Sequence, residues 1–290
     1  MLGGEPDPSC RERAAVNYRH AFHAGNFADL VKHATLTLLL DRLRADAAPL
    51  TVVDTHAGAG GYDLDGEMSR RTGEAAQGIF RLMEAQGAPA EFDALKAAVR
   101  AGNPKGGVRF YPGSPSLIAG GLRRGDRYVA CELRDDDHAL LAQTLARHPG
   151  AKAVQDDGFG VAGREAGKGG RLFVLIDPPF ERADDYERIA EAMGTVLGLD
   201  PDACVAVWLP LKDLETFDAF LRRVEPAAPE LLIAEARLKP LSDPMKMNGC
   251  AMVIAGGPAG LEGPLEAICG WVAGRLGETG GRAEVWSTAS

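Results

Sequence analysis

An aspartate, two prolines and a phenylalanine follow a buried apolar run in the stretch LFVLIDPPFERADDY, residues 172–186. Asp177 lies where that run ends, and ligands of open α/β sheets bind beyond the carboxyl ends of the strands. Pro178 and Pro179 have fixed φ angles and no amide hydrogen, so we expect a rigid, extended backbone with free carbonyl acceptors. A carboxylate beside a prolyl carbonyl suits an exocyclic amino group, and Phe180 offers a flat face for a planar ring. The stretch predicts a holder for an aromatic amine; alternatively, it only ends a strand, with Phe180 capping the core.

A glycine turn is the second candidate for chemistry. In DTHAGAG, residues 54–60, Gly58 and Gly60 let the backbone close under a nucleotide-like ligand where a side chain would collide. Such a turn is usually followed by an acid about 20 residues later. Here the matching acid is Glu132, at the tip of the next core strand, where a carboxylate can accept both hydroxyls of a ribose. The alternative is that Glu132 is an ordinary surface acid at a strand end.

Histidines are concentrated near the N-terminus. Four of the six, His20, His23, His33 and His56, fall between residues 20 and 56, which raises the question of a metal site. His20 and His23 are three residues apart with no carboxylate between them, so the helical HExxH zinc pattern is absent. We therefore expect neutral, hydrogen-bonding histidines and no metal.

The elements that must position these residues alternate between strand and helix. Short apolar runs predict strands near residues 50–54, 127–133, 172–177, 204–211, 231–238 and 250–257, and most are separated by stretches with apolar residues at helical spacing. One such stretch, ADLVKHATLTLLLDRLRAD, predicts a long helix before the first strand. Alternation of this kind predicts an α/β fold with a mostly parallel, doubly wound sheet. The last two predicted strands are too close for a helical crossover, so we expect them to pair antiparallel.

An insertion interrupts this pattern. More than 60 residues separate the first predicted strand from the second, whereas a simple crossover unit needs about 30. Two short helical patterns within this gap predict a small helical subdomain at residues 62–106. The main domain would then comprise residues 17–61 and 107–290, after a disordered leader at residues 1–16.

Composition limits the possible classes of protein. The chain has 290 residues and a net charge of −9, which argues against a protein that coats nucleic acid with its whole surface. The segment from Arg100 to Arg127 is nevertheless basic, either as a local nucleic-acid patch or as an ordinary solvated face. Five scattered cysteines, and no apolar segment typical of a signal peptide or membrane span, predict a soluble, cytoplasmic protein. We expect a monomer.

The order of these motifs along the chain is more specific than any one of them. It resembles the class I S-adenosylmethionine-dependent methyltransferases, in which a glycine turn, an acid, QDDGF (155–159) and DPPF follow successive strands. Within that class the chain resembles the RlmJ family, the 23S rRNA (adenine(2030)-N(6))-methyltransferases. YRHAFHAGNFADLVKH (18–33), RTGEAAQGI (71–79) and FYPGSP (110–115) carry this resemblance, which extends over about residues 17–290.

The resemblance implies a class I methyltransferase fold, a Rossmann-like doubly wound sheet with an antiparallel last strand, and a set of site residues. The implied contacts of the cofactor, S-adenosylmethionine, are His33, His56, Ser114, Glu132, Asp157, Gly158 and Asp177. Asp177 is the implied catalytic acceptor, and Tyr18, Pro178 and Phe180 the implied substrate contacts. Family members commonly carry tyrosine after the two prolines, so Phe180 keeps the ring but loses a hydroxyl.

The implied activity is transfer of a methyl group from S-adenosylmethionine to the N6 amino group of an adenine in 23S ribosomal RNA. Asp177 would accept the amino group and Phe180 would stack on the flipped base. The same chemistry on DNA adenine or on a protein glutamine is an alternative. So is a non-catalytic RNA-binding factor with this fold; a metal-dependent hydrolase is more distant.

Overall fold

The structure is a computed structural model that describes residues 23–241 and 246–288. The predicted leader at residues 1–16, together with His20 and Tyr18, lies outside the described residues. Within the described part, no helix combines the length and apolar character needed to cross a membrane.

One eight-stranded sheet forms the centre of the molecule, with strand order β5-β4-β1-β6-β7-β9-β8-β10. The strands are β1 (Leu50–Asp54), β4 (Arg127–Cys131), β5 (Ala151–Val154), β6 (Arg171–Ile176), β7 (Cys204–Leu211), β8 (Leu231–Arg237), β9 (Gly249–Ala255) and β10 (Arg282–Ser287). The strands from β5 to β7 pair in parallel, whereas β9 and β10 run antiparallel to their neighbours. This confirms the predicted Rossmann-like, doubly wound fold of class I methyltransferases.

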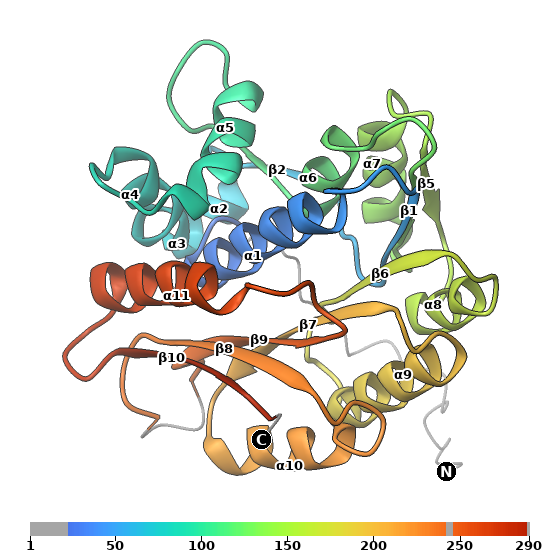
Figure 1. The fold of residues 1–290 in the computed structure, drawn as a ribbon. Coiled ribbons are helices and arrows are strands. Elements are labelled where there is room, and N and C mark those ends of the chain that lie inside the picture. The colour runs from blue at the N-terminus through green and yellow to red at the C-terminus, as the bar shows by residue number, and fades with distance from the viewer. Residues whose placement is uncertain (1–22, 242–245, 289–290) are drawn as a thin grey trace, which may run out of the picture.

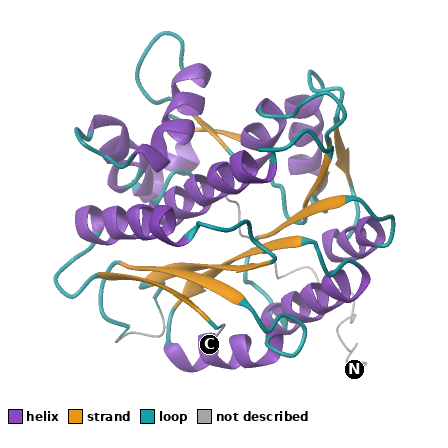
Figure 2. Cartoon of the chain, in the orientation of Figure 1, coloured by secondary structure: helices purple, strands orange, loops and turns teal. Residues whose placement is uncertain are grey.

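Helices cover both faces of the sheet (Figure 1, Figure 2). On one face lie α1 (Phe27–Leu43), α6 (Ser114–Gly120), α7 (Asp135–Leu145) and α11 (Glu262–Leu276), and on the other α8 (Gly158–Ala166), α9 (Asp185–Leu199) and α10 (Leu214–Val224). The periodic stretch before the first strand forms α1 as expected, with Asn26 as its N-cap. Twelve of its seventeen residues are buried, because it lies between the sheet, α11 and the inserted helices.

The segment between β1 and β4 contains a second, two-stranded sheet and several short helices. Its elements are β2 (Gly61–Asp63), α2 (Glu67–Thr72), α3 (Glu74–Gln77), α4 (Ile79–Glu84), a 3-10 turn (Ala90–Phe92), α5 (Asp93–Gly102) and β3 (Phe110–Pro112). β2 pairs antiparallel with β3, and Phe92 places its ring 5.2 Å from that of Trp271 in α11. The inserted helices thus lie against α1 and α11 (Figure 1). The division of the chain at residues 61 and 107 stays a prediction.

Two strands of the main sheet were not among the predicted runs. β5 is a four-residue strand, AKAV, whose apolar residues are interrupted by Lys152, and β10 is an edge strand, RAEVWS, of exposed and partly buried residues. Neither forms a continuous apolar run, and each pairs with a single neighbour at an edge of the sheet, β5 with β4 and β10 with β8. The antiparallel pairing of β8 with β9 was predicted correctly.

Candidate active site

A cavity of about 850 Å³ opens at the carboxyl ends of β1, β4, β6 and β7. Eight predicted site residues line it: His33, His56, Ser114, Glu132, Gly158, Asp177, Pro178 and Phe180. They come from six separate parts of the chain. Four of these parts follow β1, β4, β5 and β6, parallel strands that end at one edge of the sheet, whereas His33 and Ser114 come from α1 and α6. Asp157 does not line this cavity, and Tyr18 lies outside the described residues.

The glycine turn after β1 is bound to Glu132. The backbone N–H of Gly58 donates to Glu132 Oε2 at 3.1 Å, and the N–H of Arg134 donates to Oε1 at 2.8 Å. Gly58 has a φ of +63°, a left-handed conformation that favours glycine. Burial raises the pKa of Glu132, although the two backbone donors oppose that shift. Glu132 is therefore held in a fixed orientation at the cavity wall and is not a loose surface acid.

Asp54, the last residue of β1, is a buried carboxylate that sequence analysis did not select. Its Oδ2 accepts hydrogen bonds from Ser114 Oγ at 2.7 Å and from Tyr128 Oη at 3.2 Å. Its Oδ1 is buried without a hydrogen-bond partner among the described residues. Burial raises the pKa of Asp54 to about 6. The chain thus keeps one acceptor oxygen unsatisfied beside the glycine turn.

The two predicted histidines make hydrogen bonds to neighbouring hydroxyls. His33 Nδ1 lies 2.7 Å from Tyr111 Oη, and His56 Nδ1 lies 2.8 Å from Thr55 Oγ1. Burial lowers the pKa of His56 to about 4, so its ring is neutral near pH 7. Among the described residues, no group of three or more histidines, cysteines and acids could hold a metal ion.

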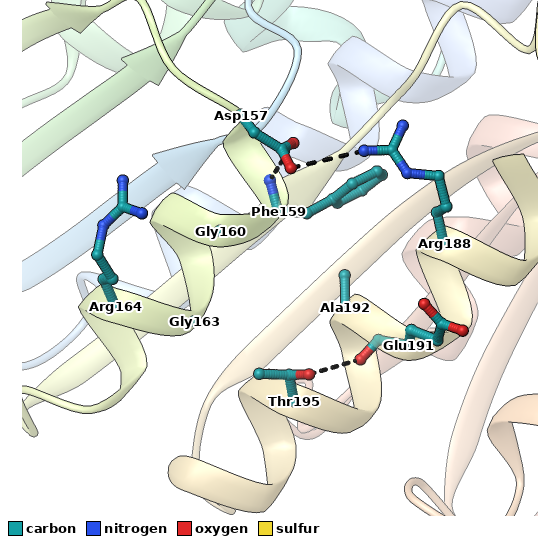
Figure 3. Close-up of a pocket in the computed structure, with 9 residues that line it drawn as sticks. All are labelled: Asp157, Phe159, Gly160, Gly163, Arg164, Arg188, Glu191, Ala192 and Thr195. Atoms are coloured by element: carbon teal, nitrogen blue, oxygen red, sulfur yellow. Dashed lines mark hydrogen bonds and ion pairs between the residues drawn. The ribbon is translucent and has the colours of Figure 1, made fainter.

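Asp157 is the N-cap of α8 and Gly158 is its first residue, and the two serve different purposes. Asp157 caps the helix by accepting from the Phe159 N–H at 3.3 Å, and its Oδ2 lies 3.5 Å from Arg188 (Figure 3). It lines a separate groove of about 450 Å³ between α8 and α9. A Cβ at Gly158 would lie 2.1 Å from the carbonyl oxygen of Thr55, so this helix start must be glycine to approach β1 so closely.

Asp177, the first residue after β6, forms an ion pair with Lys32 of α1. Lys32 Nζ lies 2.5 Å from Asp177 Oδ2 and 3.0 Å from Asp29 Oδ1. Burial opposes the charge on Lys32, but the two carboxylates outweigh it and hold the pKa of the ammonium well above its usual value. Asp177 Oδ1 has no hydrogen-bond partner in the described part of the chain. One carboxylate oxygen is therefore fixed by Lys32, and the other remains available to a ligand.

The backbone after the two prolines differs from the extended form expected. Phe180 has a φ of +52°, in the left-handed region, so the chain turns sharply at this residue. For a residue other than glycine this conformation costs on the order of 1 kcal/mol. The ring is half-buried, with centroids 5.3 Å from Tyr186 and 5.7 Å from Trp208. Phe180 therefore packs against the core and also lines the cavity.

The basic segment from Arg100 to Arg127 does not form one patch at the cavity. The guanidinium of Arg123 pairs with Asp126 and donates to the carbonyls of Arg44 and Ala48, ahead of β1. Arg127 begins β4, at the edge of the sheet opposite the cavity. Arg123 is thus a structural residue, which removes it from the predicted patch.

Comparison with known proteins identifies the family. Residues 47–288 match the family described as ribosomal RNA large subunit methyltransferase D, RlmJ. The chain belongs to the RlmJ family. This confirms the resemblance to the RlmJ family that the N-terminal and DPPF motifs indicated.

Relatives of this RlmJ family member align with it over most of their length. The ribosomal RNA large subunit methyltransferase J of Escherichia coli (strain K12) is 32% identical over 263 residues, covering 90% of this chain and 94% of the relative. The Haemophilus influenzae protein of the same name is 31% identical over 256 residues, covering 87% and 91%. The crystal structure of protein LPL1258 from Legionella pneumophila matches with a TM-score of 0.84 and 26% identity, covering 92% of this chain and 99% of that one.

Sequence analysis missed Lys32 and Asp54. Lys32 lies within YRHAFHAGNFADLVKH, and a lysine on the buried face of an apolar helix was a signal, because buried lysines are rarely unpaired. Asp54 is the last residue of β1, and Asp177 directly follows β6, so an aspartate at the carboxyl end of a strand was the available signal.

Proposed function

We propose that this RlmJ family member transfers a methyl group from S-adenosylmethionine to the N6 amino group of an adenine in 23S ribosomal RNA, at an A2030-type site. One observation carries the proposal. Asp177, with a free oxygen, and the pair formed by Glu132 and the glycine turn lie in the same cavity. Such a cavity can hold a nucleoside-containing donor at one end and an amino-bearing acceptor at the other. Membership of a family whose relatives are named large subunit rRNA methyltransferases supports ribosomal RNA as the substrate.

The residues present fit S-adenosylmethionine. Glu132 offers a fixed carboxylate to the ribose hydroxyls. Ser114, whose hydroxyl donates to the buried Asp54, lines the same cavity and adds a polar contact. The neutral ring of His56 adds a polar contact without a positive charge that would repel a sulfonium. When bound, S-adenosylmethionine supplies an electrophilic methyl group on that sulfonium.

The acceptor end positions a weak nucleophile. Adenine N6 has a lone pair delocalised into the ring, so holding it in line with the methyl group is the main contribution expected of the protein. Asp177 Oδ1 and the Pro178 carbonyl would accept the two N6 hydrogens, while Lys32 keeps the carboxylate from rotating. General-base assistance is typically worth about 10² to 10⁴ in rate.

The target base must leave the RNA stack to reach Asp177. Extrusion costs a few kcal/mol, which contacts to the base edge and stacking on Phe180 would offset. Because the ring of Phe180 is already partly covered by Tyr186 and Trp208, we expect its stacking contribution to fall at the low end of the range. A monomeric state and a cytoplasmic location stay predictions, which light scattering and cell fractionation would test.

The test uses labelled S-adenosylmethionine with separated RNA, DNA and protein fractions from cells that lack this protein, followed by mapping of N6-methyladenine in 23S rRNA. We expect label in 23S rRNA at one adenine. Asp177→Ala should bind the cofactor and lose transfer by at least about 10²-fold. Asp218→Ala, an exposed acid on α10, is the matched control and should behave as wild type.

Label in DNA or in protein would redirect the proposal to those substrates. No cofactor binding by calorimetry would favour a non-catalytic RNA-binding factor. An active Asp177→Ala enzyme would remove that residue from the acceptor role.

A further inference from the structure

A carboxylate of the inserted helices holds the turn that leads into α1. Glu74, the first residue of α3, accepts from Asn26 Nδ2 through Oε2 at 2.9 Å and lies 2.8 Å from His23 Nδ1 through Oε1. Both partners belong to residues 23–26, the turn before α1. The side chain is bidentate, so it fixes the turn in orientation as well as in distance. Glu74, His23 and Asn26 all line the 850 Å³ cavity.

Backbone contacts join the same two segments independently of Glu74. The N–H of Ile79 donates to the carbonyl of Gly25 at 2.8 Å. A Cβ at Gly78 would lie 2.1 Å from that same oxygen, and a Cβ at Gly25 would lie 2.8 Å from Ile79 Cγ2. Gly25 also has a left-handed φ of +78°. The turn therefore packs closely, backbone against backbone, on the junction of α3 and α4.

A continuous set of hydrogen bonds connects this turn to the carboxylate after β6. Asn26 Oδ1 accepts from the Asp29 N–H at 3.0 Å, and Asp29 Oδ2 accepts from the Gly25 N–H at 2.8 Å. The other oxygen of Asp29 pairs with Lys32 at 3.0 Å, and Lys32 reaches Asp177 at 2.5 Å. The turn thus sets the position of Asp29, and Asp29 shares the ammonium that holds Asp177.

We propose that Glu74 is a positioning residue, through which the inserted helices set the geometry of Lys32 and Asp177 for the reaction. This rests on the proposed function, because it assigns Asp177 the acceptor role. Glu74 does not need to touch the adenine to act. Displacing a reacting group by about 1 Å can cost on the order of 10²-fold in rate, so the loss of one distant anchor is enough to reduce catalysis.

The charge on His23 reports whether this anchor is in place. The hydrogen bond to Glu74 raises the pKa of His23, with smaller coulombic contributions in the same direction from Glu74 and Asp29, while burial opposes them. Removing Glu74 should let the pKa of His23 fall toward its ordinary value. The fall in the pKa of His23 shows that the anchor is lost, whereas kcat and the exchange of the Gly25 and Asp29 amides show whether that loss is transmitted to the site.

The experiment compares wild type with Glu74→Ala, Glu74→Gln and the control Glu84→Gln. Glu84 is an exposed acid at the end of α4, with no ion pair to the described residues. The measurements are kcat and KM with 23S rRNA, cofactor affinity by calorimetry, hydrogen exchange of the Gly25, Asp29 and Ile79 amides, and the NMR titration of His23. Thermal unfolding identifies any variant that fails to fold.

We expect Glu74→Ala to lower kcat by about ten- to a hundredfold, with cofactor affinity within twofold of wild type. The Gly25 and Asp29 amides should exchange at least about tenfold faster, and the pKa of His23 should fall. Glu74→Gln keeps one acceptor oxygen and should fall between Ala and wild type, which tests the role even if Glu74→Ala unfolds. Glu84→Gln should match wild type.

The positioning role would be overturned if the wild type is active and Glu74→Ala retains its kcat. It would also be overturned if the Gly25 and Asp29 amides of Glu74→Ala exchange at the wild-type rate. A wild type that transfers no methyl group to rRNA adenine would instead refute the proposed function. The exchange and titration data do not depend on the substrate, so these two failures are distinguishable.

Discussion

The two ends of the cavity hold their carboxylates by different means. At the end proposed for the cofactor, Glu132 is fixed by two backbone N–H groups within its own and the neighbouring loop. Behind the cavity wall, the fully buried Asp54 is fixed by two hydroxyls, one of them from Ser114, which lines the cavity. At the end proposed for the acceptor, Asp177 is fixed by the ammonium of Lys32, from a helix 145 residues away in the chain. We call these ends the cofactor half (Asp54, Gly58 and Glu132) and the acceptor half (Lys32, Asp177 and Phe180).

This difference affects how rigidly each carboxylate is held and how much free energy its desolvation costs. The donors that hold Glu132 are backbone groups, so no second charge has to be desolvated to fix it. An ion pair between partly buried side chains requires both charges to be desolvated, and loss of one partner leaves the other uncompensated. The acceptor half also carries Phe180 in a left-handed conformation. The acceptor half therefore depends more on single side-chain partners, and we expect it to be more sensitive to single substitutions.

Removal of the ammonium should have the largest effect. Lys32→Met keeps the length of the side chain but leaves Asp29 buried and Asp177 without a cation. We expect the free energy of unfolding to fall by about 3 kcal/mol and kcat by at least about 10²-fold, with cofactor affinity within a few-fold of wild type. Denaturant unfolding, single-turnover kinetics and calorimetry measure the three quantities.

Lys152→Met, on the edge strand β5, is the control for loss of a lysine and should behave as wild type. If Lys32→Met reduced cofactor affinity as much as kcat, the two halves would not be independent, and the contrast drawn above would be wrong.

The pH dependence of stability should report on the cofactor half through Asp54. Its pKa is about 6 in the folded protein, against 3.8 ordinarily, because it is buried. A raised pKa contributes stability that is present below about pH 4 and is lost as the pH rises through about 6. Asp54→Asn cannot ionise, so its stability relative to wild type should rise across this window by on the order of 3 kcal/mol.

Urea unfolding of both proteins at several pH values between 4 and 7.5 measures this difference. Parallel stability profiles for wild type and Asp54→Asn would mean that Asp54 does not titrate in this range.

Local motifs allowed much of the cofactor half to be predicted. The glycine turn and Glu132 each follow a strand that has its own apolar signal, so the rule that parallel strands end at one edge was enough to bring them together. The same rule placed Asp177 and Pro178 at the cavity. The helix α1 was predicted because its apolar spacing is regular over four turns.

The pairing of Lys32 with Asp177 was not predicted, because no local pattern links residues so far apart. Which face of α1 meets β6 depends on how the helix packs between the sheet, α11 and the inserted helices. The left-handed turn at Phe180 was also missed, since the two prolines indicate an extended chain and only tertiary packing against Tyr186 and Trp208 reverses it. β10 was missed because charged residues interrupt its apolar ones, so it lacks a continuous apolar run.

A substitution at Glu132 should weaken the cofactor half without changing the acceptor half. Glu132→Gln replaces one of its two acceptor oxygens with an NH₂ group that faces a backbone N–H. We expect cofactor affinity to fall by about tenfold, equivalent to roughly 1.4 kcal/mol, and kcat at saturating cofactor to stay within a few-fold of wild type. Calorimetry measures the cofactor affinity, and kinetics at saturating cofactor measure kcat.

Glu215→Gln, an exposed acid in α10, is the matched control. A large fall in kcat for Glu132→Gln at saturating cofactor would show that the two halves are coupled.

Substitutions of Phe180 should have the smallest effects on KM and stability. They distinguish the contribution of its ring from that of its backbone conformation. Phe180→Ala and Phe180→Gly both remove the ring, so each should raise KM for RNA by about fivefold, with unchanged cofactor affinity. Only glycine adopts a φ of +52° without cost, so Phe180→Gly should be more stable than Phe180→Ala by about 1 kcal/mol. Equal stability would mean that the turn relaxes in the variants, and unchanged KM would mean that the adenine stacks elsewhere. If both results held, the strain at Phe180 would serve packing against Tyr186 and Trp208 rather than the reaction.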